Sequence, residues 1–152
     1  MNSIYQHTFK SINGNNINLS DYQNNILLIV NTASQCGFTH QFKNLQAVFD
    51  EFKNQGLVVL GFPSNDFGNQ DPGTDDEILE FCQHNFDVSF PIMQKSSLQE
   101  NPLYKDLIEQ TGSAPNWNFT KYLIEPNATS IQVFPRDVDP IYEIRDAIMQ
   151  MI

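Results

Sequence analysis

Basic residues are scarce in this chain: 8 Lys and Arg stand against 18 Asp and Glu, which gives a formal net charge of −10 at pH 7. Such an excess of negative charge repels phosphate backbones and anionic lipid headgroups, so we expect no nucleic-acid and no membrane partner. Long apolar runs are absent too, because the longest one, Ile26–Val30, falls far short of the roughly 20 residues of a transmembrane helix. The segment Met1–His7 has neither the basic nor the apolar part of a secretory signal, which favours a cytoplasmic protein.

Cysteine and histidine are rare as well. Cys36 and Cys82 lie too far apart for a zinc knuckle or a C-x-x-C redox motif, and His7, His40 and His84 are scattered. We therefore expect no metal site and no bound cofactor. Two thiols in a reducing compartment are usually buried small hydrophobic groups, and that interpretation stands beside any reactive one.

What the chain does contain is enough apolar material for one domain. It has 152 residues, of which 40% are hydrophobic and 12% aromatic, so a largely disordered chain is excluded. A chain of this length can hold a core without disulfides or a structural metal. No repeat, linker or low-complexity tract divides it, and we expect a single domain over residues 1–152.

The apolar pattern of the first half predicts a βαβ unit. Ile26–Val30 is a continuous β-branched and leucine run, which is typical of a strand covered on both faces. Residues 41–54 place apolar side chains on one helical stripe, and Gly56 ends that helix. Leu57–Phe62 is a second buried strand, so we expect it to run parallel to the first with a right-handed crossover.

Further elements surround this unit. Residues 5–19 predict a hairpin that turns at Asn13–Gly14. Thr74–Glu77 is a capping box that begins a second helix, whose apolar face consists of Ile78, Leu79, Cys82 and Phe86. A third helix over 103–110, a hairpin of strands 120–124 and 130–134, and a last helix from Asp139 complete the chain. This order predicts the α/β class and a thioredoxin-like fold, with a central mixed β-sheet, helices on both faces and an N-terminal β-hairpin.

Cys36 lies where an α/β sheet places its chemistry. It follows the end of a buried strand and precedes a helix, and ligands bind beyond the carboxyl ends of such strands. The unpaired N–H groups and the dipole of the helix favour a thiolate there. Its neighbours are Ser, Gln, Gly and Thr rather than an apolar stripe, which favours a reactive thiol over a core cysteine.

Three segments around and beyond Cys36 carry a resemblance. Asn31–Thr39 (NTASQCGFT), Leu60–Gly73 (LGFPSNDFGNQDPG) and Trp117–Leu123 (WNFTKYL) resemble, in this order, the three signatures of the glutathione peroxidase family. With the joining segments the resemblance covers about residues 3–150. Any one segment is suggestive, whereas all three in order are highly specific.

The resemblance implies a catalytic tetrad of Cys36, Gln70, Trp117 and Asn118. When a peroxidatic thiolate attacks a peroxide, negative charge moves to the departing oxygen, and neutral N–H donors stabilise it without blocking the attack. Gln70 and Asn118 offer amide N–H groups, and Trp117 offers its indole N–H. Without the resemblance, Trp117 is best interpreted as a packing anchor and Gln70 as a solvated loop residue.

The chain departs from the family pattern in two places. The second signature often has Cys-Asn-Gln where this chain has Ser64, Asn65 and Asp66. Ser64 removes a third thiol, so only one disulfide can form within the chain. Asp66 adds a carboxylate, which either opposes thiolate formation or points to solvent. The stretch around Pro135–Arg136 also differs from the usual sequence, and nothing in the sequence explains its role.

Cys82 lies on the apolar stripe of the second helix, so by itself it reads as a buried core thiol. Its position resembles the resolving cysteine of the cysteine-type, thioredoxin-dependent subgroup. The chain also lacks the long insertion before Trp117 that marks the tetrameric, glutathione-using members. The resemblance therefore implies a thiol peroxidase that reduces hydrogen peroxide and organic hydroperoxides through a Cys36 sulfenic acid. Cys82 then forms a disulfide with Cys36, and thioredoxin reduces it.

Three alternatives stay open. Glutathione, as an external thiol, can replace thioredoxin as the reductant. A redox sensor or relay can pass the oxidation of Cys36 to a partner protein. A thioredoxin-like binding module with an inert thiol is a third class, which the complete tetrad disfavours. We expect a monomer or a weak homodimer.

Overall fold

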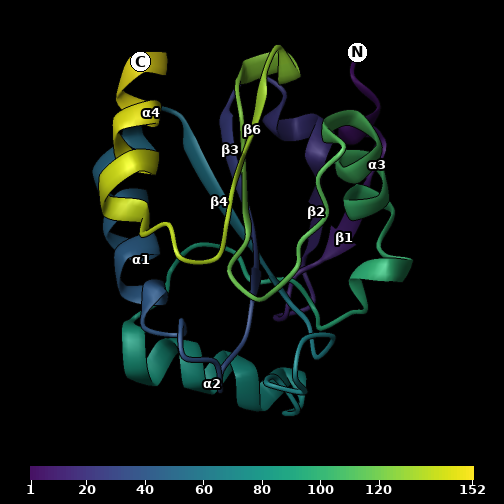
Figure 1. Ribbon diagram of the computed structural model, residues 1–152, viewed down its shortest axis with the longest axis vertical. Coiled ribbons are helices and arrows are strands. Elements are labelled where there is room, and N and C mark those ends of the chain that lie inside the picture. Colours follow the sequence, from purple (N-terminus) through teal and green to yellow (C-terminus); the bar gives the residue numbers. More distant parts are fainter.

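A four-stranded sheet in the order β4-β3-β5-β6 forms the centre of the structure, a computed structural model that describes residues 1–152 (Figure 1). Its strands are β3 (Ile26–Thr32), β4 (Leu57–Pro63), β5 (Lys121–Ile124) and β6 (Ile131–Phe134). β3 and β4 run parallel, whereas β5 pairs antiparallel with both β3 and β6. The expected α/β class and the mixed sheet are confirmed.

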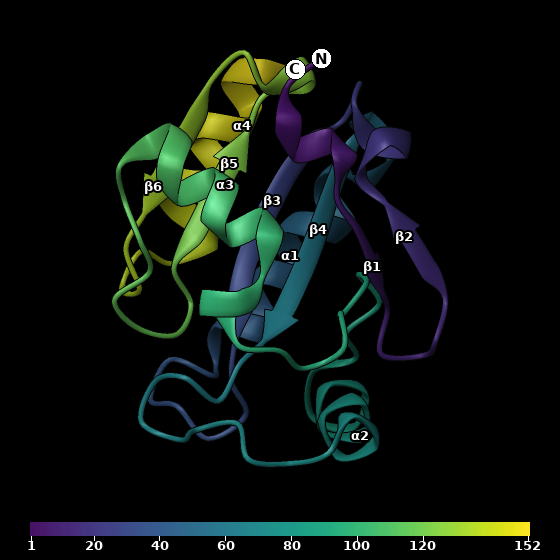
Figure 2. The same cartoon turned by 90° about the vertical axis from the view of Figure 1, so that its right-hand side faces the viewer.

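Both faces of β3 are covered, because successive side chains of a strand point to opposite faces and all of β3 is buried. Leu28 and Val30 pack in a core with side chains of α1 (Gln41–Phe52), α2 (Asp75–Phe86) and the segment that ends in α4 (Arg145–Met151). Leu27 and Ile29 pack in a second core with α3 (Pro102–Thr111) and the N-terminal segment. Figure 2 shows α3 on the near face of the sheet and α1 and α4 behind it.

The expected βαβ unit is present with nearly the expected bounds. The apolar stripe of α1 buries Phe42, Leu45 and Val48 against the sheet. A 3-10 turn at Lys53–Gln55 follows, and Gly56 at φ +100° reverses the chain into β4, which most other residues would do only under strain.

The N-terminal hairpin is shorter than expected. β1 (Thr8–Lys10) pairs antiparallel with β2 (Asn16–Asn18), but the strand does not extend back to Tyr5. Residues Ser3–Gln6 instead form a 3-10 turn, because the Asn2 side chain accepts the Ile4 N–H at 3.1 Å. The turn buries both Ile4 and Tyr5, which an alternating strand would place on opposite faces.

The other helices begin where the sequence places them. The capping box of α2 is formed, since the Thr74 hydroxyl accepts the Glu77 N–H and the Glu77 carboxylate accepts the Thr74 N–H. The last helix starts after Asp139 as a wider π-type turn, Pro140–Ile144, and continues as α4. Within this turn Ile141 is 36% exposed, whereas Ile144 and Ile148 are buried against the sheet side.

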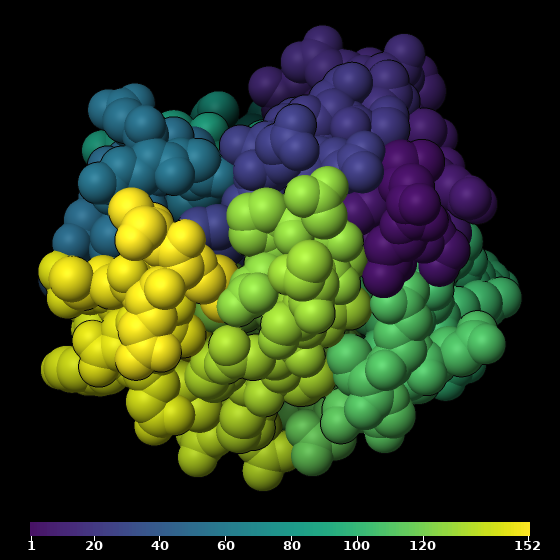
Figure 3. Space-filling view, turned by 90° about the horizontal axis from the view of Figure 1, so that it is seen from above, coloured from purple at the N-terminus to yellow at the C-terminus, as the bar shows by residue number.

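The two ends of the sheet differ. α2 lies across the end at which β3 and β4 stop (Figures 1 and 2). At the opposite end, the N-terminal segment, the β5–β6 connection and the C-terminal helix lie side by side and close the surface (Figure 3). No helix of the structure combines the length and the apolar character needed to cross a membrane.

Candidate active site

The three segments that resemble family signatures meet at the carboxyl end of β3. The Gln35 N–H donates to the Gln70 carbonyl oxygen at 2.9 Å, which joins the first segment to the second. Asn31, near the end of β3, joins the third: its Nδ2 donates to the Trp117 carbonyl at 3.0 Å, and its Oδ1 accepts the Thr120 N–H at 3.0 Å. Segments far apart in the sequence therefore form one site.

Cys36 is held in a tight turn ahead of α1. Its sulfur accepts the Phe38 N–H at 3.4 Å, and its own N–H donates to Thr39 Oγ1 at 2.9 Å. The Thr39 hydroxyl in turn donates to the Ala33 carbonyl at 3.0 Å. The expected donors were the unpaired N–H groups of the helix, but α1 starts only at Gln41, and the N–H that reaches the sulfur belongs to the turn. The segment between β3 and α1 is long enough to form a turn, and a backbone N–H of this turn donates to the Cys36 sulfur.

Gln70 and Asn118 lie side by side. Asn118 is fully buried, and its Nδ2 donates to Gln70 Oε1 at 3.2 Å and to the Phe67 carbonyl at 3.4 Å. The amide hydrogens that Asn118 was expected to offer a substrate are thus donated to Gln70 and to the Phe67 backbone. Because its Oε1 is occupied by Asn118, Gln70 presents Nε2 as its remaining donor.

Trp117 packs on the loop that carries Gln70. Its ring centroid lies 6.0 Å from that of Phe67. At Gly68, which has φ +67°, an added Cβ would lie 2.9 Å from Trp117 Cη2, so only glycine allows this approach. The structure brings the four expected tetrad residues to one end of the sheet, although the hydrogen bond to the Cys36 sulfur comes from Phe38 rather than from the other three.

Strained backbone flanks two of these residues. Phe119, which follows Asn118, has φ +65°, and Asn69, which precedes Gln70, has φ +51°. A positive φ is an outlier for a bulky residue such as Phe119. Its ring is fully buried and packs edge-to-face on Phe42 at 5.4 Å, which holds the strained turn in place. Strain of this kind concentrates at functional sites.

Cys82 faces inward from the middle of α2 and is 1% exposed. Both cysteines are free thiols and belong to the same apolar core. Burial raises the pKa of the Cys82 thiol to about 12, and the negative charge of Asp71 adds to this shift. Cys82 is therefore a neutral thiol at pH 7.

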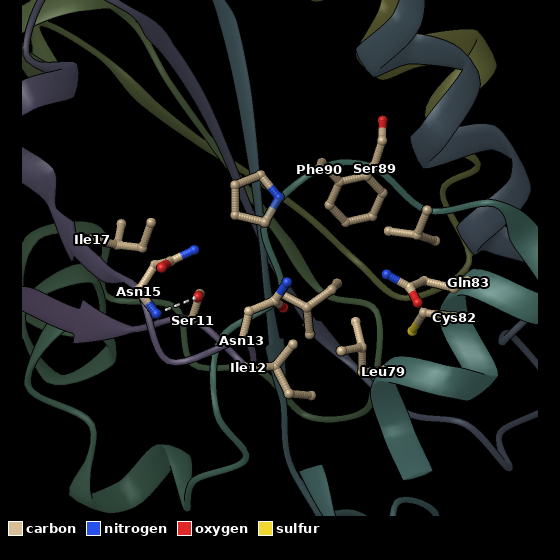
Figure 4. A pocket seen from close by; sticks show the side chains of 13 residues that line it. Ser11, Ile12, Asn13, Asn15, Ile17, Leu79, Cys82, Gln83, Ser89 and Phe90 are labelled. Atoms are coloured by element: carbon tan, nitrogen blue, oxygen red, sulfur yellow. Dashed lines mark hydrogen bonds between the residues drawn. The ribbon is translucent and has the colours of Figure 1, made fainter. Parts of the chain in front are cut away.

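A pocket of about 390 Å³ lies beside Cys82, as Figure 4 shows. Cys82, Leu79 and Gln83 line its α2 wall, and the hairpin turn from Ser11 to Asn15 forms the facing wall. Cys36 does not line it.

No three His, Cys, Asp or Glu side chains come together in the structure as metal ligands would.

Asp66 and Ser64, the first departure from the family pattern, serve the loop itself. The Asp66 carboxylate accepts the Leu98 N–H at 2.7 Å and the Ser97 hydroxyl at 3.5 Å. Ser64 is buried, and its hydroxyl oxygen accepts the Asp66 N–H at 3.1 Å. The extra carboxylate is therefore used to hold the turn at residues 97–98.

Lys121 contacts the backbone of the stretch around Pro135–Arg136, which is the second departure from the family pattern. It is fully buried, and its ammonium donates to the carbonyl oxygens of Pro135, Arg136 and Val138 at 3.4, 3.2 and 2.5 Å. The Gln41 side chain also donates to the Arg136 carbonyl, at 2.7 Å. Burial lowers the pKa of Lys121 to about 7. The segment 135–138 is thus folded around a buried lysine at the start of β5.

Sequence reasoning missed three residues that hold the site together: Asn31, Thr39 and Asp71. Asn31 is a polar residue inside an otherwise apolar strand, and that was a usable signal. Thr39 follows Cys36 by three positions, a spacing at which a hydroxyl can bond back to the backbone. Asp71 looked like an ordinary loop carboxylate, yet it is 1% exposed.

Known proteins resemble this chain in sequence and in fold. The family model described as glutathione peroxidase matches residues 4–108. The glutathione peroxidase homolog BsaA of Halalkalibacterium halodurans is 42% identical, over 99% of each chain. The glutathione peroxidase-like peroxiredoxin gpx1 of Schizosaccharomyces pombe is 39% identical, over 87% of this chain and 88% of its own. The crystal structure of Trgpx in apo form has a TM-score of 0.77 at 32% identity, covers 98% of this chain and 94% of that one, and confirms the thioredoxin-like fold. Matches of this length, on a chain whose three signatures meet at one site, mean that it belongs to the glutathione peroxidase family.

Proposed function

We propose that the protein is a thiol peroxidase in which Cys36 reduces hydrogen peroxide and organic hydroperoxides. The Cys36 thiolate attacks one peroxide oxygen, the O–O bond breaks, and the departing oxygen takes a proton to leave as water or an alcohol. Cys36 is left as a sulfenic acid. The observation that carries this proposal is the meeting of three loops around Cys36, whose sulfur already accepts the Phe38 N–H at 3.4 Å.

The neighbouring side chains have different roles in this step. Gln70 and Trp117 are neutral donors that stabilise the charge developing on sulfur and on the departing oxygen. Asn118 acts through Gln70, because its Nδ2 binds Gln70 Oε1 and so directs Gln70 Nε2 away from itself. This orientation favours Gln70 over Asn118 as the direct donor.

Cys82 resolves the sulfenic acid in the proposed cycle. Its thiol attacks the Cys36 sulfur, a disulfide forms, and the hydroxyl group leaves as water after taking the thiol proton. Because Cys82 is buried in the middle of α2, that helix has to open locally around residues 80–85. Gln83, His84 and Asn85 are already exposed, which lowers the cost of unwinding this turn. Thioredoxin then reduces the disulfide by thiol–disulfide exchange.

A second candidate is direct reduction of the Cys36 sulfenic acid by glutathione. One specific observation favours it: burial and the Asp71 charge raise the pKa of Cys82 to about 12, which makes this thiol a slow nucleophile until α2 opens. A redox relay shares the first step, the oxidation of Cys36 by peroxide. It differs in the second step, because a partner protein rather than a small thiol takes over the oxidation.

Coupled turnover distinguishes these possibilities. NADPH consumption with peroxide is measured once with thioredoxin and its reductase, and once with glutathione and its reductase. We expect thioredoxin to support turnover, Cys82→Ser to lose that turnover while keeping one rapid oxidation of Cys36, and Cys36→Ser to lose both. Faster turnover with glutathione that survives Cys82→Ser would establish the second candidate instead, and peroxide reduction by Cys36→Ser would overturn the peroxidase assignment of Cys36.

A further inference from the structure

Asp71 is a buried carboxylate with no role in the proposed chemistry so far. It is 1% exposed, and burial raises the pKa of its carboxyl group. Its Oδ2 atom is buried and has no hydrogen-bond partner. An unpaired buried carboxylate oxygen is costly, so a group of this kind calls for an explanation beyond stability.

The other oxygen of Asp71 holds the turn that contains Cys36. Asp71 Oδ1 accepts the Ser34 hydroxyl at 2.7 Å and the Ser34 N–H at 3.1 Å. The neighbouring Gln35 N–H donates to the Gln70 carbonyl at 2.9 Å. Three hydrogen bonds therefore join the two residues before Cys36 to Gln70 and Asp71.

The backbone of Asp71 is fixed on its other sides. Its N–H donates to Asn65 Oδ1 at 2.9 Å, which closes the loop that carries Gln70. Its carbonyl oxygen accepts the Lys95 ammonium at 3.2 Å. Asp71 cannot shift without moving Gln70, and Ser34 cannot shift without moving Cys36.

We propose that Asp71 is a positioning residue, which fixes the Cys36 turn against the Gln70 loop and so sets the distance from the Cys36 sulfur to the Gln70 amide. This inference rests on the proposed roles of Cys36 and Gln70. Misplacement of a reacting group by about 1 Å costs on the order of 100-fold in rate, so the hydrogen bonds of one carboxylate are sufficient to control the oxidation step.

The chain offers a matched control in Asp66. This residue lies on the same loop and also accepts one backbone N–H and one serine hydroxyl, but from Leu98 and Ser97, which do not lead to Cys36. Asp66→Ala and Asp71→Ala therefore remove similar bonds from one loop. Only Asp71→Ala removes the side-chain hydrogen bonds that join the Cys36 turn to the Gln70 loop.

The test is the rate of Cys36 oxidation in a single turnover with hydrogen peroxide, without any reductant, followed by the fluorescence of Trp117, the only tryptophan. We expect Asp71→Ala to slow oxidation by about 10- to 100-fold and Asp66→Ala to leave it within about twofold. Asp71→Asn keeps an oxygen for Ser34 and is expected to restore most of the rate. Ser34→Ala removes only the hydroxyl donor and is expected to slow oxidation several-fold.

Because Asp71 is buried whereas Asp66 is exposed, Asp71→Ala can also cost more stability, so urea unfolding of each variant is measured in parallel and oxidation rates are compared where every variant is folded. Wild-type oxidation rates in Ser34→Ala and in a folded Asp71→Ala would overturn the proposal, and so would an Asp71→Asn as slow as Asp71→Ala. If Asp71→Ala does not fold, Asp71→Asn and Ser34→Ala decide. A failure of the proposed peroxidase function would look different: Cys36→Ser would then still react with hydrogen peroxide at the wild-type rate.

Discussion

Lys121 makes the stability of this protein depend on pH in an unusual direction. Burial lowers its pKa from 10.5 to about 7, while the negative charges of Asp139 and Asp137 act in the opposite direction. Between these two pH values the unfolded chain binds a proton that the folded chain does not. Stability therefore rises with pH across this window, and the cost of burying the ammonium is greatest below pH 7.

The size of the effect follows from the shift. A shift of one pKa unit corresponds to about 1.4 kcal/mol, so the whole window is worth roughly 5 kcal/mol. Between pH 7.5 and 9 the free energy of unfolding should increase by about 2 kcal/mol. Cys82 sets the upper limit of the experiment: its pKa is raised from 9.0 to about 12, so from about pH 9 the ionisation of the unfolded thiol offsets the gain from Lys121 and the rise in stability levels off.

Urea unfolding, followed by circular dichroism at several pH values from 7.5 to 9 with the thiols kept reduced, measures this slope. Lys121→Gln is neutral but keeps two N–H donors for the surrounding carbonyls, so its stability should be nearly independent of pH in this range. Lys43→Gln removes the same charge from an exposed position of α1 and should keep the wild-type slope. Equal slopes for wild type and Lys121→Gln would refute the reasoning.

The remaining predictions concern the site. Trp117→Phe keeps a ring but removes the indole N–H, and it should slow Cys36 oxidation by about 10- to 1000-fold in quenched single turnovers analysed by mass spectrometry; unchanged kinetics would leave Trp117 a packing role. Gly68→Ala should destabilise the protein by about 1–2 kcal/mol and shift the Trp117 fluorescence, because the new Cβ lies 2.9 Å from that ring; Gly14→Ala, at φ +89° with nothing within 4 Å, should show the backbone cost alone. One equivalent of peroxide should produce a Cys36–Cys82 bridge in peptide maps and faster amide exchange across α2, whereas a stable sulfenic acid beside a free Cys82 would contradict the resolving role.

Regular elements could be predicted because each depends on a local pattern. The apolar run of β3, the stripe of α1 and the capping box of α2 are all visible in the sequence, and all three are present. Ile4 and Tyr5 escaped prediction because a cap from Asn2 and burial against α3 decide their conformation. Neither contact is visible in a window of alternating residues.

The candidate residues of the site could be named from the sequence, whereas the contacts between them could not. The resemblance named Cys36, Gln70, Trp117 and Asn118, and the fold places them at one end of the sheet. The sequence could not show that Asn118 holds Gln70, or that Phe38 donates to the sulfur, because these contacts depend on loop conformation. Lys121 was missed for a similar reason, since a lysine in a strand reads as a solvent-facing residue until three carbonyls are found around it.

The burial of Cys82 in the apolar core has a consequence for the redox potential. In the proposed cycle, α2 must open before Cys82 reaches Cys36, so the disulfide form loses packing that the dithiol form keeps. Burying one side chain of the size of Leu79 is worth about 1.5–3 kcal/mol. A loss of about 2 kcal/mol raises the potential of a two-electron couple by roughly 40 mV. In this cycle the packing of α2 would make the oxidised form easier to reduce, so the core itself would help to return Cys36 to its thiol.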